Sequence, residues 1–459
     1  MSAEGLERAR QIMAAASVPA RAVDVFAHYY AQLEQGATGT IDEADVSPLT
    51  DPTQLADLPH TPDERDAFAR TAVIRLNGGL GTSMGLHRAK SLLTVRDDLT
   101  FLDLIVRQVL SARAALDVPL PLLFMNSFRT REDTLDALAA YPHLPVAGLP
   151  VDFLQNQEPK LRTDDLMPVR WPSDPSLEWC PPGHGDLYTA LEVSGVLSAL
   201  VDAGFRYASV SNSDNLGATP DPAIASWFAH SGAPYAAEVC RRTPADRKGG
   251  HLVVRKSDGR LVLRDSAQIR PEDADAAADT ERHPYFHTNN LWLDLTAVAR
   301  ALEERDGVLG LPLIRNVKTV DPTDDTSPEV VQIETAMGAA VEVFEGARAI
   351  AVPRSRFLPV KTTDDLLLTR SDVYELRADH TLRPMVDEAP LVRLDPTYFG
   401  KVGDFEPRVS AGVPSMVGAV ALDVHGDWTF GPRVTVQGRV ELEDQGRPST
   451  VAEGTVLSG

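Results

Sequence analysis

The chain has 459 residues, and 66 Asp and Glu against 44 Lys and Arg give it a formal net charge of −22 at neutral pH. Most of its surface therefore repels nucleic acid and anionic lipid, so we expect neither a nucleic-acid polymer nor a membrane as a partner. A phosphate-bearing ligand would need a locally basic cleft. The length exceeds what one hydrophobic core usually supports, which favours two or three domains.

The cysteine content and the first residues favour a cytoplasmic protein. Cys180 and Cys240 are the only cysteines, too few for a disulfide framework. Residues 1–13 mix charged with apolar side chains and lack the uninterrupted apolar segment of a secretion signal. The sequence also has no apolar run near the roughly 18 residues that a membrane-spanning helix needs.

The hydrophobic pattern predicts a helical start followed by an α/β region. Apolar residues recur at helical spacing over 4–35, and Pro19 interrupts them, which predicts two amphipathic helices. A polar stretch over about 36–66 follows. From about 71 to 370, short apolar runs alternate with amphipathic segments, which is typical of an α/β fold.

Three short apolar runs in that region predict buried strands that end at polar residues. They lie at 73–76, 122–125 and 207–210. Thr100 and Asp103 form the pattern of a capping box and predict the start of a helix. Ligands of open α/β sheets bind beyond the carboxyl ends of the strands, so we expect the site where these runs end.

The last 60 residues carry pairs of apolar residues every six positions: Leu422 and Val424, Trp428 and Phe430, Val434 and Val436, Val440 and Leu442. A six-residue repeat with one such rung per unit predicts a parallel β-helix whose rungs stack. The alternative is an antiparallel meander, whose turns rarely keep so strict a register. The rungs favour a stacking surface over a catalytic role, so a homo-oligomer through this region is expected.

A glycine-rich loop follows the first predicted strand directly, in the run from Leu76 to Gly85. Missing side chains let backbone N–H groups approach phosphate oxygens or a base edge closely. Met84 stands where a dinucleotide fingerprint needs glycine, and Lys90-Ser91 follows Ala89 where the Walker pattern needs glycine, so both of those loops are excluded. A tight turn without a ligand is the structural alternative.

The run from Leu76 to Gly85 resembles the signature loop of the eukaryotic-type UTP–glucose-1-phosphate uridylyltransferases, also called UDP-glucose pyrophosphorylases. Further blocks similar to that family follow in the same order, spread over residues 71 to about 375: Met125–Phe128, Pro181–Asp186, Ser211–Thr219, Thr288–Trp292 and Pro353–Asp364. The chain departs from the family where Ala89 precedes Lys90 in place of a Gly-Pro pair.

The resemblance implies a fold and a division of the chain. It implies a Rossmann-like (GT-A-like) nucleotidyltransferase sheet, mixed and flanked by helices, with a left-handed parallel β-helix after it and a small helical cap before it. The expected parts are an N-terminal helical segment over 1–65, a catalytic domain over 66–382 and a C-terminal β-helix domain over 383–459. The implied reaction converts UTP and glucose 1-phosphate to UDP-glucose and pyrophosphate.

Uridylyl transfer is an in-line attack by an already ionised phosphate oxygen, so it needs alignment and charge neutralisation rather than a covalent nucleophile. The resemblance implies that Lys90 and Lys361 contact the phosphates from opposite sides and that Asp214 binds Mg²⁺, the expected cofactor. A solvated lysine and a turn aspartate are the alternatives. Arg354 and Arg356 add positive charge or form structural salt bridges.

The remaining implied contacts divide between nucleotide and sugar. The residues implied to contact the nucleotide are Leu76, Asn77, Gly78, Gly79, Gln155 and Gly183. The carboxamide of Gln155 can pair with both the donor and the acceptor of uracil. Those on the sugar-phosphate side are His184, Asn212, Asn289 and Glu334, with Asn290 and Thr335 as neighbours. A solvated or structurally paired carboxylate is the alternative for Glu334.

Two other functions compete with the expected one. A pyrophosphorylase for UDP-galactose or a UDP-N-acetylhexosamine would differ by a few pocket contacts, and the acetylhexosamine branch has a different loop at Asn77, Leu80, Ser83 and Met84. A non-catalytic nucleotide-sugar-binding protein would be expected to lose the lysines or the metal carboxylate first.

Overall fold

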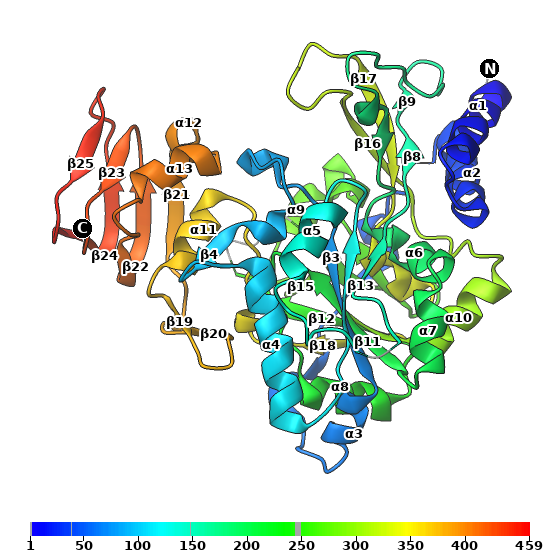
Figure 1. The fold of residues 1–459 in the computed structure, drawn as a ribbon, viewed down its shortest axis with the longest axis horizontal. Helices are drawn as coiled ribbons and strands as arrows, with labels where there is room; N and C mark the ends of the chain where they lie inside the picture. The colour runs from blue at the N-terminus through cyan, green and yellow to red at the C-terminus, as the bar shows by residue number, and fades with distance from the viewer. Residues whose placement is uncertain (1, 38, 147, 244–248) are drawn as a thin grey trace.

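The computed structural model describes residues 2–37, 39–146, 148–243 and 249–459. A central α/β body lies between the helices α1 and α2 at one end and a stack of short strands at the C-terminal end (Figure 1). The helices are α1 Ser2–Ala15, α2 Ala20–Glu34, α3 Glu64–Ala69, α4 Phe101–Leu116, α5 Arg131–Leu138, α6 Leu187–Val193, α7 Val196–Asp202, α8 Pro222–Ser231, α9 Ala274–Ala278, α10 Leu295–Glu304, α11 Thr363–Arg370, α12 Pro396–Phe399 and α13 Val402–Arg408. In the described part of the chain, every helix is too short or too polar to cross a lipid bilayer.

The central sheet is mixed, in the order β2-β18-β12-β15-β11-β3-β6-β7. Strand β15 is antiparallel to both of its neighbours, whereas β11, β3, β6 and β7 run parallel to one another. The strands are β2 Thr53–Gln54, β3 Thr71–Asn77, β6 Leu122–Asn126, β7 Asp152–Leu154, β11 Tyr207–Asn212, β12 Tyr235–Arg241, β15 Tyr285–Asp294 and β18 Arg348–Ala351, with β1 Val46–Pro48, β13 His251–Arg255 and β14 Leu261–Arg264 joined at one side.

Alternate residues of the central strands enter two different cores, because successive side chains of a strand point to opposite faces. In β3, Val73 packs with α3, α4 and α8, whereas Ala72 and Ile74 pack with α6, α7 and α10. The predicted strands and the helix opened by Thr100 are confirmed; the cap of α4 has both hydrogen bonds of a capping box. The expected mixed α/β fold is therefore present, with helices on both faces of the sheet.

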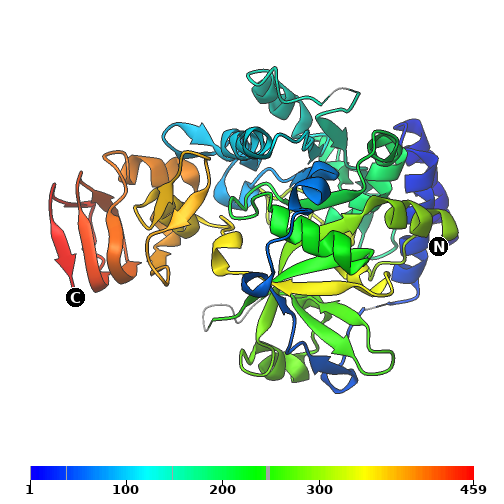
Figure 2. The ribbon, with the colours of Figure 1, turned by 90° about the horizontal axis from the view of Figure 1, so that it is seen from below.

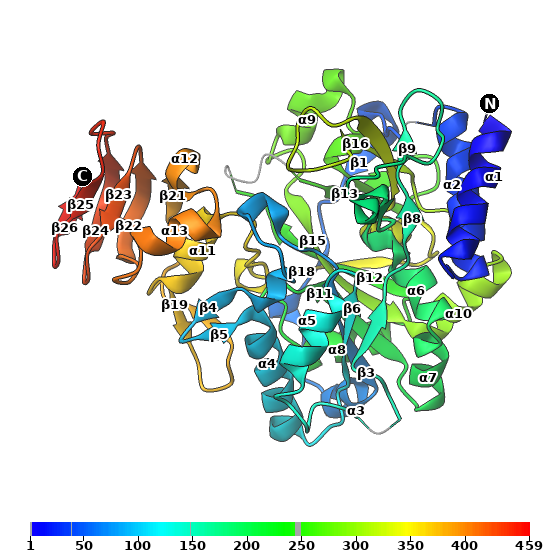
Figure 3. The same cartoon turned by 45° about the horizontal axis from the view of Figure 1, so that its top comes forward.

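Two N-terminal helices separated at Pro19 are present, as predicted, and they cover an arm of small sheets. Their apolar residues share a core with Leu161, Val331 and Ile333 of that arm, and Figure 3 shows α1 and α2 beside it. The arm strands are β8 Glu158–Pro159, β9 Leu161–Arg162, β10 Trp179–Cys180, β16 Ile314–Thr319 and β17 Glu329–Glu334. Residues 46–54, which follow the helices, contribute β1 and β2 to the edge of the central sheet.

The C-terminal strands pair in parallel, which rules out the antiparallel meander. Leu422 pairs with Val440 and Val424 with Leu442, so apolar rungs eighteen residues apart stack in register. The stack stands apart from the central sheet in Figure 2. Its strands are β21 Leu391–Leu394, β22 Ser415–Val424, β23 Trp428–Phe430, β24 Thr435–Leu442, β25 Ser449–Val451 and β26 Val456–Ser458, and the hairpins β19 Tyr374–Leu376 with β20 Leu382–Pro384 and β4 Thr94–Arg96 with β5 Leu99–Thr100 lie between it and the body.

Candidate active site

A cleft lies where the parallel strands end, because β3, β6 and β11 are in register and finish together. Asn77 pairs with Asn126, and Leu76 pairs with Asn212. The cleft has a volume of about 290 Å³, close to the lower end of the range of small-molecule sites. Its walls come from seven separate segments: Leu76, Gly78, Gly79, Lys90, Met125, Gln155, Pro181, Gly183, His184, Asn212, Ser213, Asp214 and Glu334.

The glycine loop presents backbone to this cleft. Gly81 and Gly85 have φ of +69° and +74°, which only glycine adopts without strain. A Cβ on Gly78 would lie 2.6 Å from Oε1 of Gln155, whereas a Cβ on Gly79 would meet no protein atom within 4 Å. The loop is therefore held closely on one side by Gln155 and is open on the other, where a ligand can approach the main chain.

Two lysines from distant parts of the chain meet at one carboxylate. Nζ of Lys90 lies 2.8 Å from Oδ2 of Asp214, and Nζ of Lys361 lies 3.0 Å from the same oxygen. Burial by itself raises the pKa of Asp214, but the charges and hydrogen bonds of Lys361 and Lys90 outweigh it, so the pKa lies below its ordinary value. Asp214 is thus ionised at neutral pH, between two ammonium groups.

The second carboxylate oxygen of Asp214 is in a different state. Oδ1 is buried and has no hydrogen-bond partner among the described residues. A buried acceptor without a partner is costly, which makes this oxygen a candidate ligand for a hard cation. In the part of the chain that the structure describes, no group of three or more His, Cys, Asp or Glu side chains is arranged to hold a metal.

The loop that carries His184 is clamped between two other segments. Gln155 donates to the carbonyl of Gly183 at 2.7 Å. Gly183 has φ of +75°, and a Cβ there would lie 2.7 Å from the carbonyl oxygen of Thr335. Gly185 in turn donates its N–H to Thr335 at 2.8 Å. Glycine is needed at position 183 both for its backbone conformation and for this close approach.

The hydrogen bonding of His184 defines its tautomer. Nδ1 accepts from the backbone N–H of Met337 at 3.0 Å, so the neutral ring carries its proton on Nε2. Burial, together with the charge of Lys361, lowers the pKa of His184 to about 4, although Asp265 acts in the opposite direction. At neutral pH, His184 is therefore an uncharged hydrogen-bond donor at the cleft.

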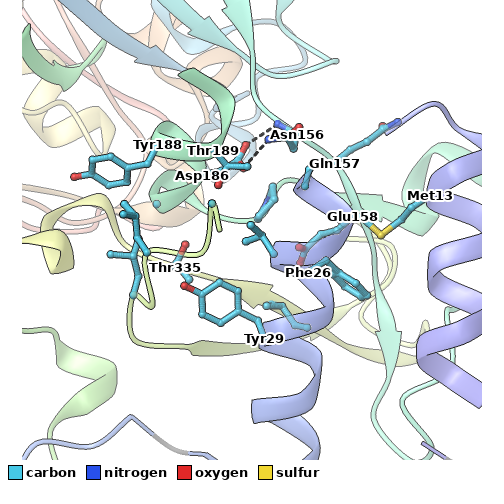
Figure 4. Close-up of a pocket in the computed structure, with 18 residues that line it drawn as sticks. Met13, Phe26, Tyr29, Asn156, Gln157, Glu158, Asp186, Tyr188, Thr189 and Thr335 are labelled. Carbon is cyan, nitrogen blue, oxygen red and sulfur yellow. Dashed lines mark hydrogen bonds between the residues drawn. The ribbon is translucent and has the colours of Figure 1, made fainter. Parts of the chain in front are cut away.

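Two buried acids lie behind this loop, against the N-terminal helices. Figure 4 shows Asp186 accepting from Asn156, through its backbone N–H at 2.6 Å and its side chain at 2.8 Å. Burial raises the pKa of Asp186 to about 7. Burial and the nearby Asp186 raise the pKa of Glu158 well above its ordinary value. The bond between Asn156 and Asp186 ties the segment after Gln155 to the segment after His184.

The sugar-side candidates divide between the cleft and its support. Asn212 and Glu334 line the cleft, and Asn316 holds Glu334 through a 2.7 Å hydrogen bond. Asn289, at φ of +59°, does not line it; its side chain lies 3.2 Å from Nδ1 of His287. Asn290 donates to Glu238 and to a backbone carbonyl, which gives it a structural role.

Two other sequence candidates also have structural contacts. The side chain of Asn77 is buried and donates to Asn126 at 2.8 Å and to Thr134 at 2.9 Å, so it braces β3 against β6 rather than lining the cleft. Arg356 is buried and pairs with Glu238 at 2.7 Å, the salt-bridge role that the sequence left open.

Three residues line the cleft without having been assigned a role from the sequence: Met125, Pro181 and Ser213. The first is the next-to-last residue of β6, and all three lie within blocks already recognised. The rule that ligands bind beyond strand ends would have indicated Met125 and Ser213. Ser213 also donates to Asn77 at 3.1 Å, which joins the segment that carries Asp214 to the start of the glycine loop.

Converging ammonium groups and exposed loop amides at the ends of parallel strands are the means by which proteins neutralise a phosphate that is being transferred. Fold and site together define a nucleotidyltransferase. The chain belongs to the UTP–glucose-1-phosphate uridylyltransferase family, whose model matches residues 23–437.

Similar proteins cover almost the whole chain. The UTP–glucose-1-phosphate uridylyltransferase of Hordeum vulgare is 38% identical over 92% of this chain and 89% of its own length. That of Saccharomyces cerevisiae is 40% identical over 86% and 78%. A mutant UDP-glucose pyrophosphorylase from Leishmania major, solved in complex with UDP-glucose, superposes with a TM-score of 0.92 at 40% identity and covers 99% of this chain and 98% of its own.

Proposed function

We propose that this cleft binds UTP, glucose 1-phosphate and Mg²⁺ and joins the sugar phosphate to the α-phosphorus of UTP, releasing pyrophosphate. The chain's membership of the uridylyltransferase family gives the reaction. The observation that carries the residue assignment is the convergence of Lys90 and Lys361 on Asp214.

The two lysines would act on charge and alignment. The attacking oxygen of glucose 1-phosphate is ionised at neutral pH, so no general base is required of the protein. Negative charge grows around the α-phosphorus as the new bond forms, and ammonium groups on two sides would stabilise it. Lys90 is 14% exposed and Lys361 58% exposed, so Lys90 is part of the wall, whereas Lys361 reaches Asp214 from the solvent side.

Asp214 fits the role of magnesium ligand that the family implies. Its Oδ1 is buried without a partner among the described residues, and a carboxylate oxygen is a ligand that hard cations prefer. When bound, Mg²⁺ would neutralise phosphate charge next to the two lysines, with phosphate and water oxygens as its other ligands. The same carboxylate holds both ammonium groups in place through Oδ2.

The other cleft residues are proposed to orient the two substrates. Gln155, Gly183 and the main chain of Leu76 to Gly79 would contact the uridine, because they form one continuous wall. His184 would donate from Nε2 to the sugar phosphate, and Asn212 and Glu334 would contact sugar hydroxyls. Asn77 and Asn289 would act on their neighbours instead, through the hydrogen bonds described above.

A substrate panel tests this assignment. Purified protein is incubated with Mg²⁺ and each of four NTPs crossed with the 1-phosphates of glucose, galactose and N-acetylglucosamine, and pyrophosphate release is measured. We expect the highest kcat/KM for UTP with glucose 1-phosphate. A higher value with another sugar would reassign the substrate, and binding of UDP-glucose without any pyrophosphate release would overturn a catalytic function.

The C-terminal region is proposed to be a left-handed parallel β-helix that mediates self-association, in a chain divided near residues 66 and 383. The parallel pairing of the rungs supports the β-helix. Four exposed apolar residues on those strands support self-association: Leu391, Val417, Val420 and Val456. Val420→Glu should lower the sedimentation coefficient if copies associate through this face; an unchanged coefficient would contradict it.

The predicted cytoplasmic location is compatible with Cys180 and Cys240, both buried free thiols.

A further inference from the structure

A second pocket lies beside the glycine loop, next to the cleft. It has a volume of about 530 Å³ and shares Gly78, Gly79, Pro181 and Glu334 with the cleft. Neither Lys90 nor Asp214 lines it. Its own walls come from the end of β6 and from the arm of small sheets, and they include three cations: Arg129, Lys160 and Lys318.

Lys160 is the unusual member of this set. Its side chain is buried at 5% exposure, and its ammonium donates to the carbonyl of Val320 at 2.8 Å. Within the described residues, no carboxylate lies within 4.0 Å of that ammonium. A buried charge is normally paired, because an unpaired one is costly. Lys160 also has its main chain fixed, through hydrogen bonds with Glu178 and Val169.

The neighbours of Lys160 add positive charge rather than neutralise it. Burial lowers the pKa of Lys160; the Cys180 thiol and Asp321 act in the opposite direction, whereas Arg129 and Lys318 lower it further. Asp321 does not line the pocket, and its carboxylate accepts from Thr323. The pocket is thus a basic region in a chain of net charge −22.

The other two cations, Lys318 and Arg129, make only weak contacts with protein groups. Lys318 is 56% exposed and lies 4.0 Å from Glu334, the only carboxylate among the lining residues. Arg129 donates to the carbonyl of Ser176, and its guanidinium lies 5.5 Å from the ring centre of Phe128. Lys318 can reorient toward an anion at little cost, because an exposed ion pair of this kind contributes little. Arg129 would exchange one hydrogen bond to a carbonyl for a contact with the anion.

The remaining walls are apolar and aromatic. Phe128, which is 38% exposed, and Trp179 line the pocket together with Leu177, Pro181 and Pro322. Flat apolar side chains beside a cluster of cations suit a ligand that has a phosphate at one end and a planar or apolar body at the other.

We propose that this pocket is a second ligand site, distinct from the transfer site, which binds a small phosphate ester with its phosphate on Lys160, Arg129 and Lys318. The ligand would rest against Gly78 and Gly79 and would not contact Lys90, which does not line this pocket. The proposal does not depend on the roles assigned to the cleft residues.

Thermal unfolding of a variant with a disabled cleft tests the proposal. The double variant Lys90→Met/Lys361→Met removes the cleft's ammonium groups and serves as the background. Its unfolding temperature is measured against inorganic phosphate and against AMP, a phosphate ester without uracil, at constant ionic strength. We expect a saturable rise with AMP, and a half-saturating AMP concentration at least about tenfold higher once Lys160→Met is added, because one charge-assisted contact is lost.

Matched variants separate the possible outcomes. Lys256→Met removes an exposed lysine that contacts Ala44 and should leave the response unchanged. Arg129→Gln should weaken binding without disturbing the buried lysine, which covers the case that Lys160→Met does not fold. If inorganic phosphate and AMP had equal half-saturating concentrations, the pocket would recognise the phosphate group alone. The proposal that it binds a phosphate ester would then be wrong. Absence of a saturable rise, or a response unchanged in both variants, would overturn the site.

Discussion

The two pockets that adjoin the glycine loop hold their positive charges in different ways. In the cleft, Lys90 and Lys361 share the carboxylate of Asp214. In the second pocket, the buried Lys160 has a backbone carbonyl as its partner and no carboxylate within the described residues. Both regions use the same two glycines as a common wall.

The difference teaches how an acidic protein prepares separate sites for phosphate. A carboxylate between two ammonium groups keeps them positioned, and its second oxygen is available to a metal. That arrangement suits a reaction in which negative charge grows around a phosphate. A buried ammonium group among other cations stabilises a bound anion whose charge does not change, which suits binding.

The largest expected effect is on turnover when the cleft loses one ammonium. Lys361→Met should lower kcat by at least about a hundredfold, as loss of a charge-stabilising contact in a transition state typically does. Pyrophosphate release at saturating UTP and glucose 1-phosphate measures it. Lys256→Met is the control for loss of one positive charge. A Lys361→Met enzyme with kcat within threefold of the parent would show that this lysine is not part of the chemistry.

An intermediate effect is expected at the shared wall. Gly79→Ala places a methyl group where no protein atom lies within 4 Å, so the unfolding temperature should stay unchanged. The same methyl group would meet a bound nucleotide, and KM for UTP should rise about tenfold, the scale of one misplaced pocket group. Steady-state kinetics and thermal unfolding together measure this.

Gly78→Ala is the comparison variant for that wall. Its methyl group would lie 2.6 Å from Gln155, so both stability and UTP affinity should decrease. If Gly79→Ala left KM for UTP unchanged, the nucleotide would not approach this part of the loop, and the two sites would not share a ligand-contacting wall.

The smallest expected effect concerns the acids behind the His184 loop. The pKa of Asp186 is raised to about 7, so between about pH 4 and 7 the folded state holds a proton that the unfolded state has released. This group therefore lowers the unfolding free energy as pH rises through that window. Asp186→Asn should remove a slope of about 1 kcal/mol per pH unit, seen in denaturant unfolding at pH 5, 6 and 7.

An exposed acid provides the matched control for Asp186. The hydrogen bonds of Ser176 hold the pKa of Asp174 below its ordinary value, so Asp174→Asn should change the pH dependence in the opposite direction and at lower pH. An Asp186→Asn protein with the parent's pH dependence would mean that Asp186 is ionised throughout this range. In that case the region behind the His184 loop would not differ from the cleft and the second pocket by holding a neutral acid.

Much of the cleft could be predicted from the sequence, because its parts are local. The glycine loop, Asp214 and the residues around His184 each follow or adjoin a short apolar run, and parallel strands bring such ends together. The capping box of α4 and the six-residue rungs are likewise local patterns with one physical meaning each. Resemblance to the family then supplied the roles that periodicity does not give.

The second pocket had no such signal. Lys160 lies between Pro159 and Leu161 in a segment with ordinary spacing, and nothing nearby in the sequence marks it as buried. Its surroundings come from residues near 129, 179 and 318, which only the folded arm brings together. The structural contacts of Asn77 and Asn289 could not be predicted from the sequence either, because a side chain's partner depends on which strand lies beside it.

The sequence by itself therefore determined the strands, the glycine loop, the C-terminal rungs and the identity of the three charges in the cleft. Each of these depends on backbone conformation and on alternation over a few residues. Tertiary structure alone decided which charges share a carboxylate and which remain without one. The free energy of a buried charge depends on every group within several ångströms, and those groups come from all parts of the chain.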